Sequence, residues 1–233
     1  MNQTFGPAGS ERFAAAVRRF DEENSRDPNH QLIDGKQVPG ELAYSRWLTQ
    51  WVLRLKPDAS EPLLLAARAA HLRRWTIARD SYPATRAGYL RWRSDLKKFH
   101  AEMAGAILRE VGYGKETIAQ VQGLISKSAF PQEAESRTLE DALCLVFLEY
   151  QFAELAQKAS EEKMVNALRK TWQKMTPSAQ AIALTLKYDS HLKVLLGRAL
   201  EPDPPARAHS GPQTPPSPPR PSSGGEGRGQ PAD

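Results

Sequence analysis

Apolar residues recur every three to four positions in nearly every segment between residues 11 and 200. This spacing places them on one face of a helix, whereas the alternation of apolar and polar residues that is typical of strands is scarce. The chain is therefore predicted to be an all-α protein, with a single compact multi-helix domain over residues 11–200. A length of 233 residues is sufficient for one well-buried core.

Signals for helix starts support this prediction. Ser60 and Thr176 each carry a side-chain oxygen that can accept from unpaired backbone amides, and Pro62 and Pro177 follow in the first turn. Long connections separate the helices at 24–40 and 76–85, and connections of this length are more often functional than short links. The predicted helices cover residues 11–23, 41–56, 60–75, 86–111, 115–127, 138–158, 160–174 and 176–200.

The two ends of the chain depart from the helical pattern. Residues 201–233 consist largely of Pro, Gly, Ser and Ala, and they cannot bury enough apolar surface to offset the entropy of ordering. A disordered Pro/Gly/Ser-rich tail over 201–233 and a flexible N-terminus over 1–10 are expected. The Pro-x-x-Pro spacing in the tail suits a proline-binding partner domain, but a solubilising tail is favoured, because such spacing is common wherever proline is abundant.

Neither a secretory signal nor a membrane span is evident in the sequence. Residues 1–10 have no basic start and no apolar run, and no stretch approaches the roughly 18 apolar residues of a membrane span. The single cysteine, Cys144, lies in the apolar run 143–148 and is expected to be a buried hydrophobe that forms no intrachain disulfide. We therefore expect a cytoplasmic protein without a membrane partner.

Positive charge is concentrated in one stretch, residues 68–98. It holds nine Lys or Arg against Asp80 and Asp95, an excess of seven positive charges, whereas the whole chain carries +5. Guanidinium groups bind phosphate oxygens and aromatic rings stack on bases, so an anionic small molecule, a nucleotide or a nucleic acid is the expected partner. The alternative is a solvated helix face. The candidate substrate-binding residues are Arg74, Arg79, Arg86, Arg93, Tyr82 and Trp92.

Three widely separated residues, His71, His100 and Asp141, are candidate ligands of a divalent metal ion. Each lies in a segment predicted to be helical, and apolar neighbours at helical spacing indicate that each faces the core. Polar groups facing a core need partners, which a shared metal or a hydrogen-bond network would supply. Two alternatives remain open: a carbonyl or a tyrosine can satisfy an inward histidine, and Thr138 with Asp141 matches the spacing of a helix capping box.

The first of two functional hypotheses is a metal-assisted hydrolase of a phosphate-bearing small molecule or nucleotide. The ion would lower the pKa of bound water, and Glu140 or Glu102 is the candidate base. The alternative function is a non-catalytic helical module that binds RNA or a nucleotide. The chain lacks a P-loop, a dinucleotide fingerprint, a Cys-x-x-Cys pair and a Gly-x-Ser-x-Gly elbow.

The chain resembles the domain of unknown function 4202 family over about residues 13–175. The resemblance depends on short strings that are specific in combination, and the family name supplies no activity. The strings are DPN (27–29), PGELAYS (39–45), AARAAHLRRW (66–75), GYLRWR (88–93), FHAE (99–102), LEDA (139–142) and RKTW (169–172).

The order of helices and ligand types also resembles the HD superfamily of metal-dependent phosphohydrolases, at a greater distance. That resemblance implies an HD-like fold in which His71, His100 and Asp141 hold the metal ion. The sequence departs from the superfamily pattern at two ligand positions, because Leu72 stands where the doublet aspartate is expected and Tyr44 where the first histidine is expected.

Overall fold

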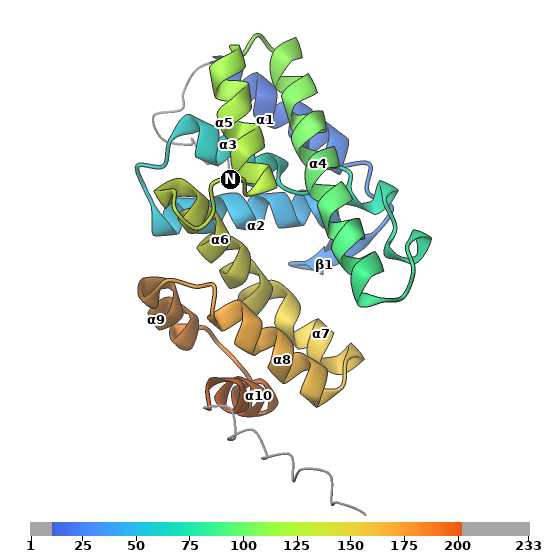
Figure 1. Ribbon diagram of the computed structural model, residues 1–233, viewed down its shortest axis with the longest axis vertical. Coiled ribbons are helices and arrows are strands. Elements are labelled where there is room, and N and C mark those ends of the chain that lie inside the picture. The colour runs from blue at the N-terminus through green and yellow to red at the C-terminus, as the bar shows by residue number, and fades with distance from the viewer. Residues whose placement is uncertain (1–10, 202–233) are drawn as a thin grey trace, which may run out of the picture. The chain divides into compact units, whose positions relative to one another are not determined.

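The periodic apolar residues form ten α-helices within residues 11–201, the part of the chain that the computed structural model describes (Figure 1). The predicted all-α fold is confirmed. The helices are α1 (Glu11–Asn24), α2 (Gly40–Leu55), α3 (Glu61–Ala69), α4 (Arg86–Glu110), α5 (Lys115–Ser126), α6 (Ala134–Val146), α7 (Phe152–Lys158), α8 (Glu161–Trp172), α9 (Pro177–Thr185) and α10 (Ser190–Leu200).

Side-chain caps fix several helix starts, as their sequences predict. Ser60 Oγ accepts from the amide of Leu63 at 3.2 Å, and Thr176 Oγ1 accepts from the amide of Ala179 at 3.3 Å. The side chain of Thr85 caps α4 in the same way. Each cap satisfies an amide that the first helical turn leaves without a backbone partner.

The helices pack around one apolar core whose most buried members include Phe20, Leu48, Leu63, Leu108 and Leu145. Helix α4 lies alongside α5, and α2 crosses below them and packs on α3 and α6 (Figure 1). Helix α6 leads down to α7, α8 and α10, where α8 packs against α10. Helix α5 thus packs against both α4 and α6.

The predicted loop 24–40 contains a β-hairpin that the sequence analysis missed. Strands β1 (His30–Ile33) and β2 (Lys36–Pro39) pair antiparallel, with His30 opposite Pro39. The turn is Asp34-Gly35, and both residues have positive φ, 49° and 75°. Two-residue hairpin turns require such φ values, and Asp-Gly is a strong sequence signal for them. The Asp34-Gly35 dipeptide is therefore the sequence signal that indicates the hairpin.

The predicted helix 60–75 ends early, so the prediction that His71 lies on a helix is wrong. Helix α3 stops at Ala69, residues 70–73 form a turn, and short 3-10 helices follow at Arg74–Thr76 and Arg79–Ser81. The turn is fixed by tertiary contacts, because Leu72 is fully buried and the amide of Arg73, with φ 49°, donates to Asn24 Oδ1. Local propensity favoured a longer helix, and packing overrode it.

The predicted helix 138–158 starts earlier and is interrupted. Glu133 caps α6, and its carboxylate accepts from the amides of Glu135 and Ser136. The capping box of Thr138 and Asp141 is therefore wrong: Thr138 lies in the first turns of α6 and donates to the carbonyl of Ala134. A π-helical turn over Phe147–Gln151 separates α6 from α7. The predicted helix 176–200 is likewise divided, into α9 and α10.

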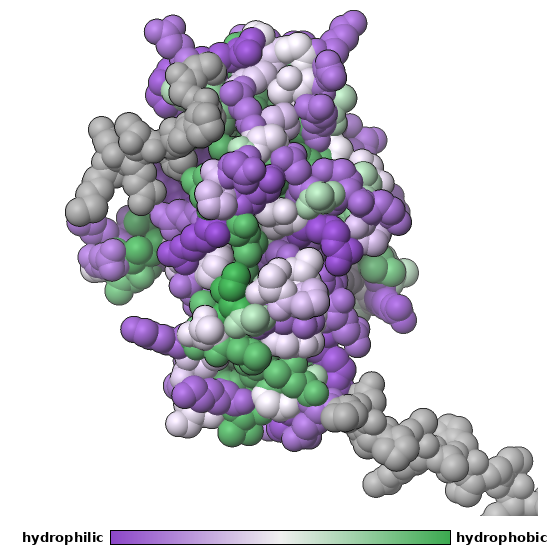
Figure 2. Space-filling model, turned by 90° about the vertical axis from the view of Figure 1, so that its left-hand side faces the viewer, coloured by the Kyte–Doolittle hydropathy of each residue, from purple (hydrophilic) through white to green (hydrophobic). Residues whose placement is uncertain are grey.

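One face of the molecule carries hydrophobic surface concentrated in its lower half (Figure 2). Helices α9 and α10 carry the exposed Leu184 and Val194, at 57% and 58% accessibility.

No helix in residues 11–201 combines the length and the apolar character needed to cross a membrane. The predicted flexible N-terminus and the predicted disordered tail lie outside the described residues, except for Glu201.

Candidate functional site

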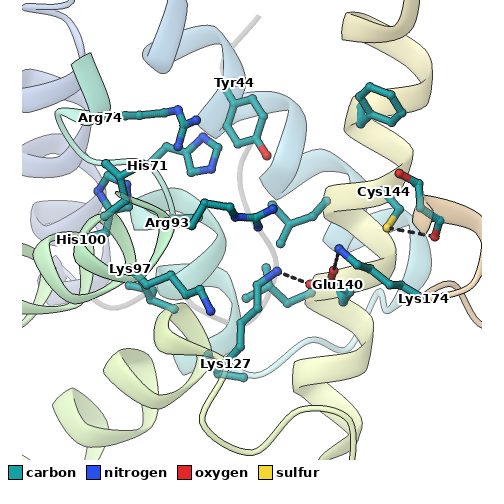
Figure 3. A pocket seen from close by; sticks show the side chains of 18 of the residues that line it. Tyr44, His71, Arg74, Arg93, Lys97, His100, Lys127, Glu140, Cys144 and Lys174 are labelled. Atoms are coloured by element: carbon teal, nitrogen blue, oxygen red, sulfur yellow. Dashed lines mark hydrogen bonds and ion pairs between the residues drawn. The ribbon is translucent and has the colours of Figure 1, made fainter. Parts of the chain in front are cut away.

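A pocket of about 370 Å³ opens between α4, the end of α5, and α6 (Figure 3). Tyr44 of α2 and Lys174, which follows α8, also line it. Within the described part of the chain, its charged lining comprises five cationic side chains and one carboxylate, an excess of four positive charges. These residues are Arg74, Arg93, Lys97, Lys127, Lys174 and Glu140.

Helix α4 supplies two rows of lining residues at helical spacing. Trp92, Leu96 and His100 are four residues apart and form the buried row. Tyr89, Arg93 and Lys97 form the neighbouring, more exposed row, and Arg93 extends into the middle of the pocket (Figure 3). Neither Arg93 nor Lys97 forms an ion pair with a carboxylate of residues 11–201. Both cations are therefore available to an anion.

His71, which lines the pocket, and Glu41 form a partly buried pair. The His71 ring stacks on Tyr44, with centroids 4.1 Å apart, and its Nδ1 lies 3.3 Å from Glu41 Oε2. Burial lowers the pKa of His71 well below its usual value, and nearby Arg74 adds to this. Burial also raises the pKa of Glu41 to about 7, although Arg74 opposes that rise. Burial thus favours the neutral form of both partners.

His100 lies next to His71, with ring centroids 5.8 Å apart, and is only 2% exposed. Its Nδ1 lies 2.9 Å from the carbonyl oxygen of Leu72, whereas its Nε2 has no hydrogen-bond partner among the described residues. Burial, and then His71, lower the pKa of His100 to about 3. An unpaired buried polar atom costs about 1–3 kcal/mol, so this nitrogen is a significant feature of the site.

Glu140 lies between two lysines on the side of the pocket opposite the histidines (Figure 3). Its carboxylate pairs with Lys127, and Lys174 Nζ lies 3.4 Å from Glu140 Oε1. Burial opposes the charge of Glu140, but the two lysines outweigh burial and lower its pKa. Lys127 has the left-handed backbone, φ 61°, that ends α5. Glu140 therefore neutralises part of the positive charge at this side of the pocket.

The predicted metal ligands do not come together. His71 and His100 are neighbours, but Asp141 does not line the pocket: its Oδ1 accepts from the Thr176 amide at 2.8 Å and its Oδ2 from the Thr176 hydroxyl at 2.6 Å. Among residues 11–201, no three His, Cys, Asp or Glu side chains are placed to share a metal ion. Asp141 instead fixes the start of α9.

The two predicted catalytic carboxylates also separate. Glu140 lines the pocket, where its two lysine partners hold it ionised. Glu102 lies outside the pocket on the surface of α4, 3.9 Å from Lys98 in an exposed pair. Glu140 is thus the predicted base that the fold brings to the site.

Three of the predicted substrate-binding residues line the pocket, namely Arg74, Trp92 and Arg93, and three do not. Arg79 donates to the carbonyls of Tyr82 and Pro83, and the hydroxyl of Tyr82 donates to Asp95 at 2.9 Å. These contacts hold the connection between α3 and α4 in place. Arg86 is exposed at the start of α4.

Several lining residues were not identified from the sequence. Lys127 and Lys174 follow the ends of α5 and α8 and meet only because Glu140 lies between them. Tyr44 carried a weak signal, since it stands where the HD pattern expects a histidine, and in the structure it stacks on His71. Cys144, whose pKa burial raises to about 12, also lines the pocket.

Comparison with known protein families matches residues 14–196 to the family described as Domain of unknown function (DUF4202). The chain belongs to this family. The match spans nearly the whole folded part, so the pocket lies within the DUF4202 region. Neither the curated proteins nor the solved structures yield a match to the chain. The resemblance of this DUF4202 protein to the HD superfamily stays a prediction.

Proposed function

We propose that the protein binds a phosphate-bearing small molecule, such as a nucleotide, in the pocket between α4, α5 and α6. The observation that carries this proposal is the charge of the lining, in which five cationic side chains face one carboxylate. Arginine binds phosphate oxygens through two parallel hydrogen bonds, and lysine adds a compact charge. An excess of four positive charges suits a multiply charged phosphate better than a single carboxylate.

The aromatic side chains at the pocket support a ligand larger than phosphate. Tyr89 and Trp92 line it, and the guanidinium of Arg74 lies 4.8 Å from the centroid of Trp92. A second cavity of about 390 Å³ shares the cationic wall with the pocket and adds Leu90 and Phe130. A ligand whose phosphate contacts the shared wall can therefore extend an apolar or aromatic group on either side, as a nucleotide does.

The proposal is tested by calorimetric titration of the full-length protein with inorganic phosphate, pyrophosphate and the common nucleoside mono-, di- and triphosphates. We expect binding of at least one phosphate compound with a dissociation constant below about 1 mM, weakening as salt is added. A single-stranded RNA oligonucleotide serves as the competitor. Preference for the RNA over every small phosphate compound would favour the RNA-binding alternative, and absence of binding throughout would overturn the proposal.

Hydrolysis of the bound phosphate compound is a second candidate function, favoured by the pairing of Glu41 with His71 beside the pocket. A carboxyl group that orients an imidazole is a common arrangement in acid–base catalysis. Release of inorganic phosphate from the tightest-binding ester, measured with and without Mn²⁺ or Fe²⁺, tests it. A product that forms only with metal supports the predicted metal-assisted hydrolase. If no product forms under either condition, the proposed function is binding without hydrolysis. The predicted cytoplasmic location is part of this proposal.

A further inference from the structure

His100 presents a hydrogen-bond acceptor to a pocket whose other charged groups are mostly cations. A backbone carbonyl oxygen can only accept, so the contact with Leu72 at 2.9 Å requires that Nδ1 of His100 carries the proton. In a neutral imidazole the other nitrogen, Nε2, then has a free lone pair. Burial of the ring and the adjacent His71 favour this neutral form.

The free nitrogen takes no part in the hydrogen-bond network of residues 11–201. The ring of His100 lines the pocket, and its Nε2 is fully buried without a partner in residues 11–201. His71 and His100 lie on one side of the pocket, while Glu140 and Lys174 lie on the opposite side (Figure 3). A buried acceptor in this position requires a donor, and the pocket is where a ligand can supply one.

A phosphate group is a poor donor for this nitrogen. At neutral pH its oxygens are mainly acceptors, so they face the guanidinium and ammonium groups and are repelled by a lone pair. A ligand ammonium group is disfavoured as well, because five cationic side chains line the same pocket. An uncharged hydroxyl group satisfies both constraints. The pocket volume of about 370 Å³ leaves room for more than a phosphate group alone.

We infer that the ligand is a hydroxyl-bearing phosphate ester, of the sugar phosphate or nucleotide class, whose hydroxyl donates to His100 Nε2. The inference rests on the proposed function and specifies its ligand. Phosphate binding by Arg93, Lys97 and the other cations supplies attraction for any phosphate compound. His100 then selects among these compounds, because a site with a buried acceptor discriminates strongly against an analogue that lacks the donor.

The test uses pairs of ligands that share a phosphate and differ in hydroxyl groups. The pairs are glycerol 3-phosphate with propyl phosphate, ribose 5-phosphate with tetrahydrofurfuryl phosphate, and AMP with 2′,3′-dideoxy-AMP. Calorimetry on the full-length wild-type protein is expected to show at least tenfold tighter binding of the hydroxyl-bearing member in at least one pair. Inorganic phosphate and pyrophosphate are titrated alongside as probes of the cationic wall alone.

Two variants separate the two nitrogens of His100. His100→Asn can still donate to the Leu72 carbonyl but has no acceptor at the position of Nε2, so we expect the preference within the pair to disappear. His100→Gln places an amide oxygen near that position, so it is expected to retain part of the preference. Pyrophosphate is titrated against both variants as the reference for the cationic side chains, which neither variant alters, and the preference is taken as the ratio of affinities within each ligand pair.

A measurement on the wild-type protein does not depend on whether the variants fold. Nitrogen-15 NMR of the imidazole is expected to show a shift of the His100 Nε2 resonance on addition of the hydroxyl-bearing ester and none with pyrophosphate. Equal affinities within every pair, or an unchanged preference in a folded His100→Asn protein, would overturn the inference while phosphate binding persists. Failure of the wild-type protein to bind any phosphate compound overturns the proposed function as well.

Discussion

Glu140 forms an ion pair with Lys127 at the edge of the pocket and is the one carboxylate of residues 11–201 that lines this pocket. The side chain of Glu140 is about 5% exposed, and its other oxygen faces Lys174 at 3.4 Å. The carboxylate therefore holds two cations in place and at the same time competes with any anion that approaches them. Glu140 therefore stabilises the fold and weakens the binding of anions.

Replacement of Glu140 by Gln is expected to lower stability and to strengthen anion binding. The change leaves the partly buried ammonium of Lys127 without its counter-charge, which costs up to about 3 kcal/mol of unfolding free energy. Pyrophosphate, which can take the place of the carboxylate, should bind about tenfold more tightly, a change of roughly 1.4 kcal/mol. Urea unfolding and calorimetry measure the two effects.

Glu102→Gln is the matched control, because Glu102 is an exposed partner of Lys98 outside the pocket. It should change neither stability nor pyrophosphate affinity appreciably. Weaker pyrophosphate binding by Glu140→Gln would contradict the competitive role and indicate that Glu140 helps to hold the ligand.

Replacement of Asp141 by Ala tests its structural role. Asp141 accepts from both the amide and the hydroxyl of Thr176 and so fixes the start of α9. Hydrogen bonds to a charged group contribute about 1.5–3 kcal/mol, so a loss of unfolding free energy in that range is expected. Pyrophosphate affinity should remain unchanged, whereas a loss of bound metal together with affinity would support the predicted metal site.

The Thr138→Ala variant tests whether Asp141 acts together with Thr138 in the helix capping box that their spacing suggests. Thr138 donates to the carbonyl of Ala134 inside α6 and caps no amide there. Its removal is expected to change the unfolding free energy by less than about 0.5 kcal/mol, as for ordinary surface substitutions. A loss as large as that of Asp141→Ala would indicate that the two residues act together.

The pH dependence of stability should report the buried His100. Its pKa is about 3 in the folded protein, against 6.5 for an unperturbed histidine. As the pH falls below 6.5 the unfolded chain takes up a proton that folded His100 does not, so stability decreases toward acid. Between pH 7 and pH 5 this group alone accounts for a loss of about 2 kcal/mol.

The His100→Asn variant should lack this loss of stability toward acid. The difference between the unfolding free energies of the variant and the wild-type protein, followed across the pH range, gives the contribution of His100. Glu41, whose pKa burial raises to about 7, contributes with the opposite sign, since its stabilisation of the fold is lost as the pH rises. Both proteins retain Glu41, so its contribution largely cancels in the difference. Parallel pH profiles of the two proteins would show that His100 is not held neutral.

Gly88 allows the connection before α4 to approach the helix closely. A Cβ atom at Gly88 would lie 2.2 Å from the carbonyl oxygen of Pro83. Gly88→Ala should therefore displace the connection and destabilise the protein by about 1–3 kcal/mol. Gly197→Ala is the control, since nothing lies within 4 Å of its added Cβ in α10, and it should stabilise the helix by about 0.5–1 kcal/mol. Thermal unfolding of both variants measures the two changes in stability.

Apolar spacing and cap residues were enough to predict the helical fold, because both signals are local. The sequence also singled out His71, His100, Arg93 and Glu140, which line one pocket. Asp141 lies outside the pocket and binds Thr176, which is 35 residues away, and only the packing of α9 on α6 brings these two residues together. The contributions of Lys127 and Lys174 likewise depend on tertiary contacts that have no local signature.

The most direct test of the central claim compares pyrophosphate binding by two arginine variants of the same helix. Arg93 lines the pocket, whereas Arg91, two residues away on α4, is exposed beside Asp95. Arg93→Gln is expected to weaken pyrophosphate binding at least tenfold, while Arg91→Gln stays within twofold of the wild-type protein. Equal affinities of the two variants would contradict the assignment of this pocket as the phosphate-binding site.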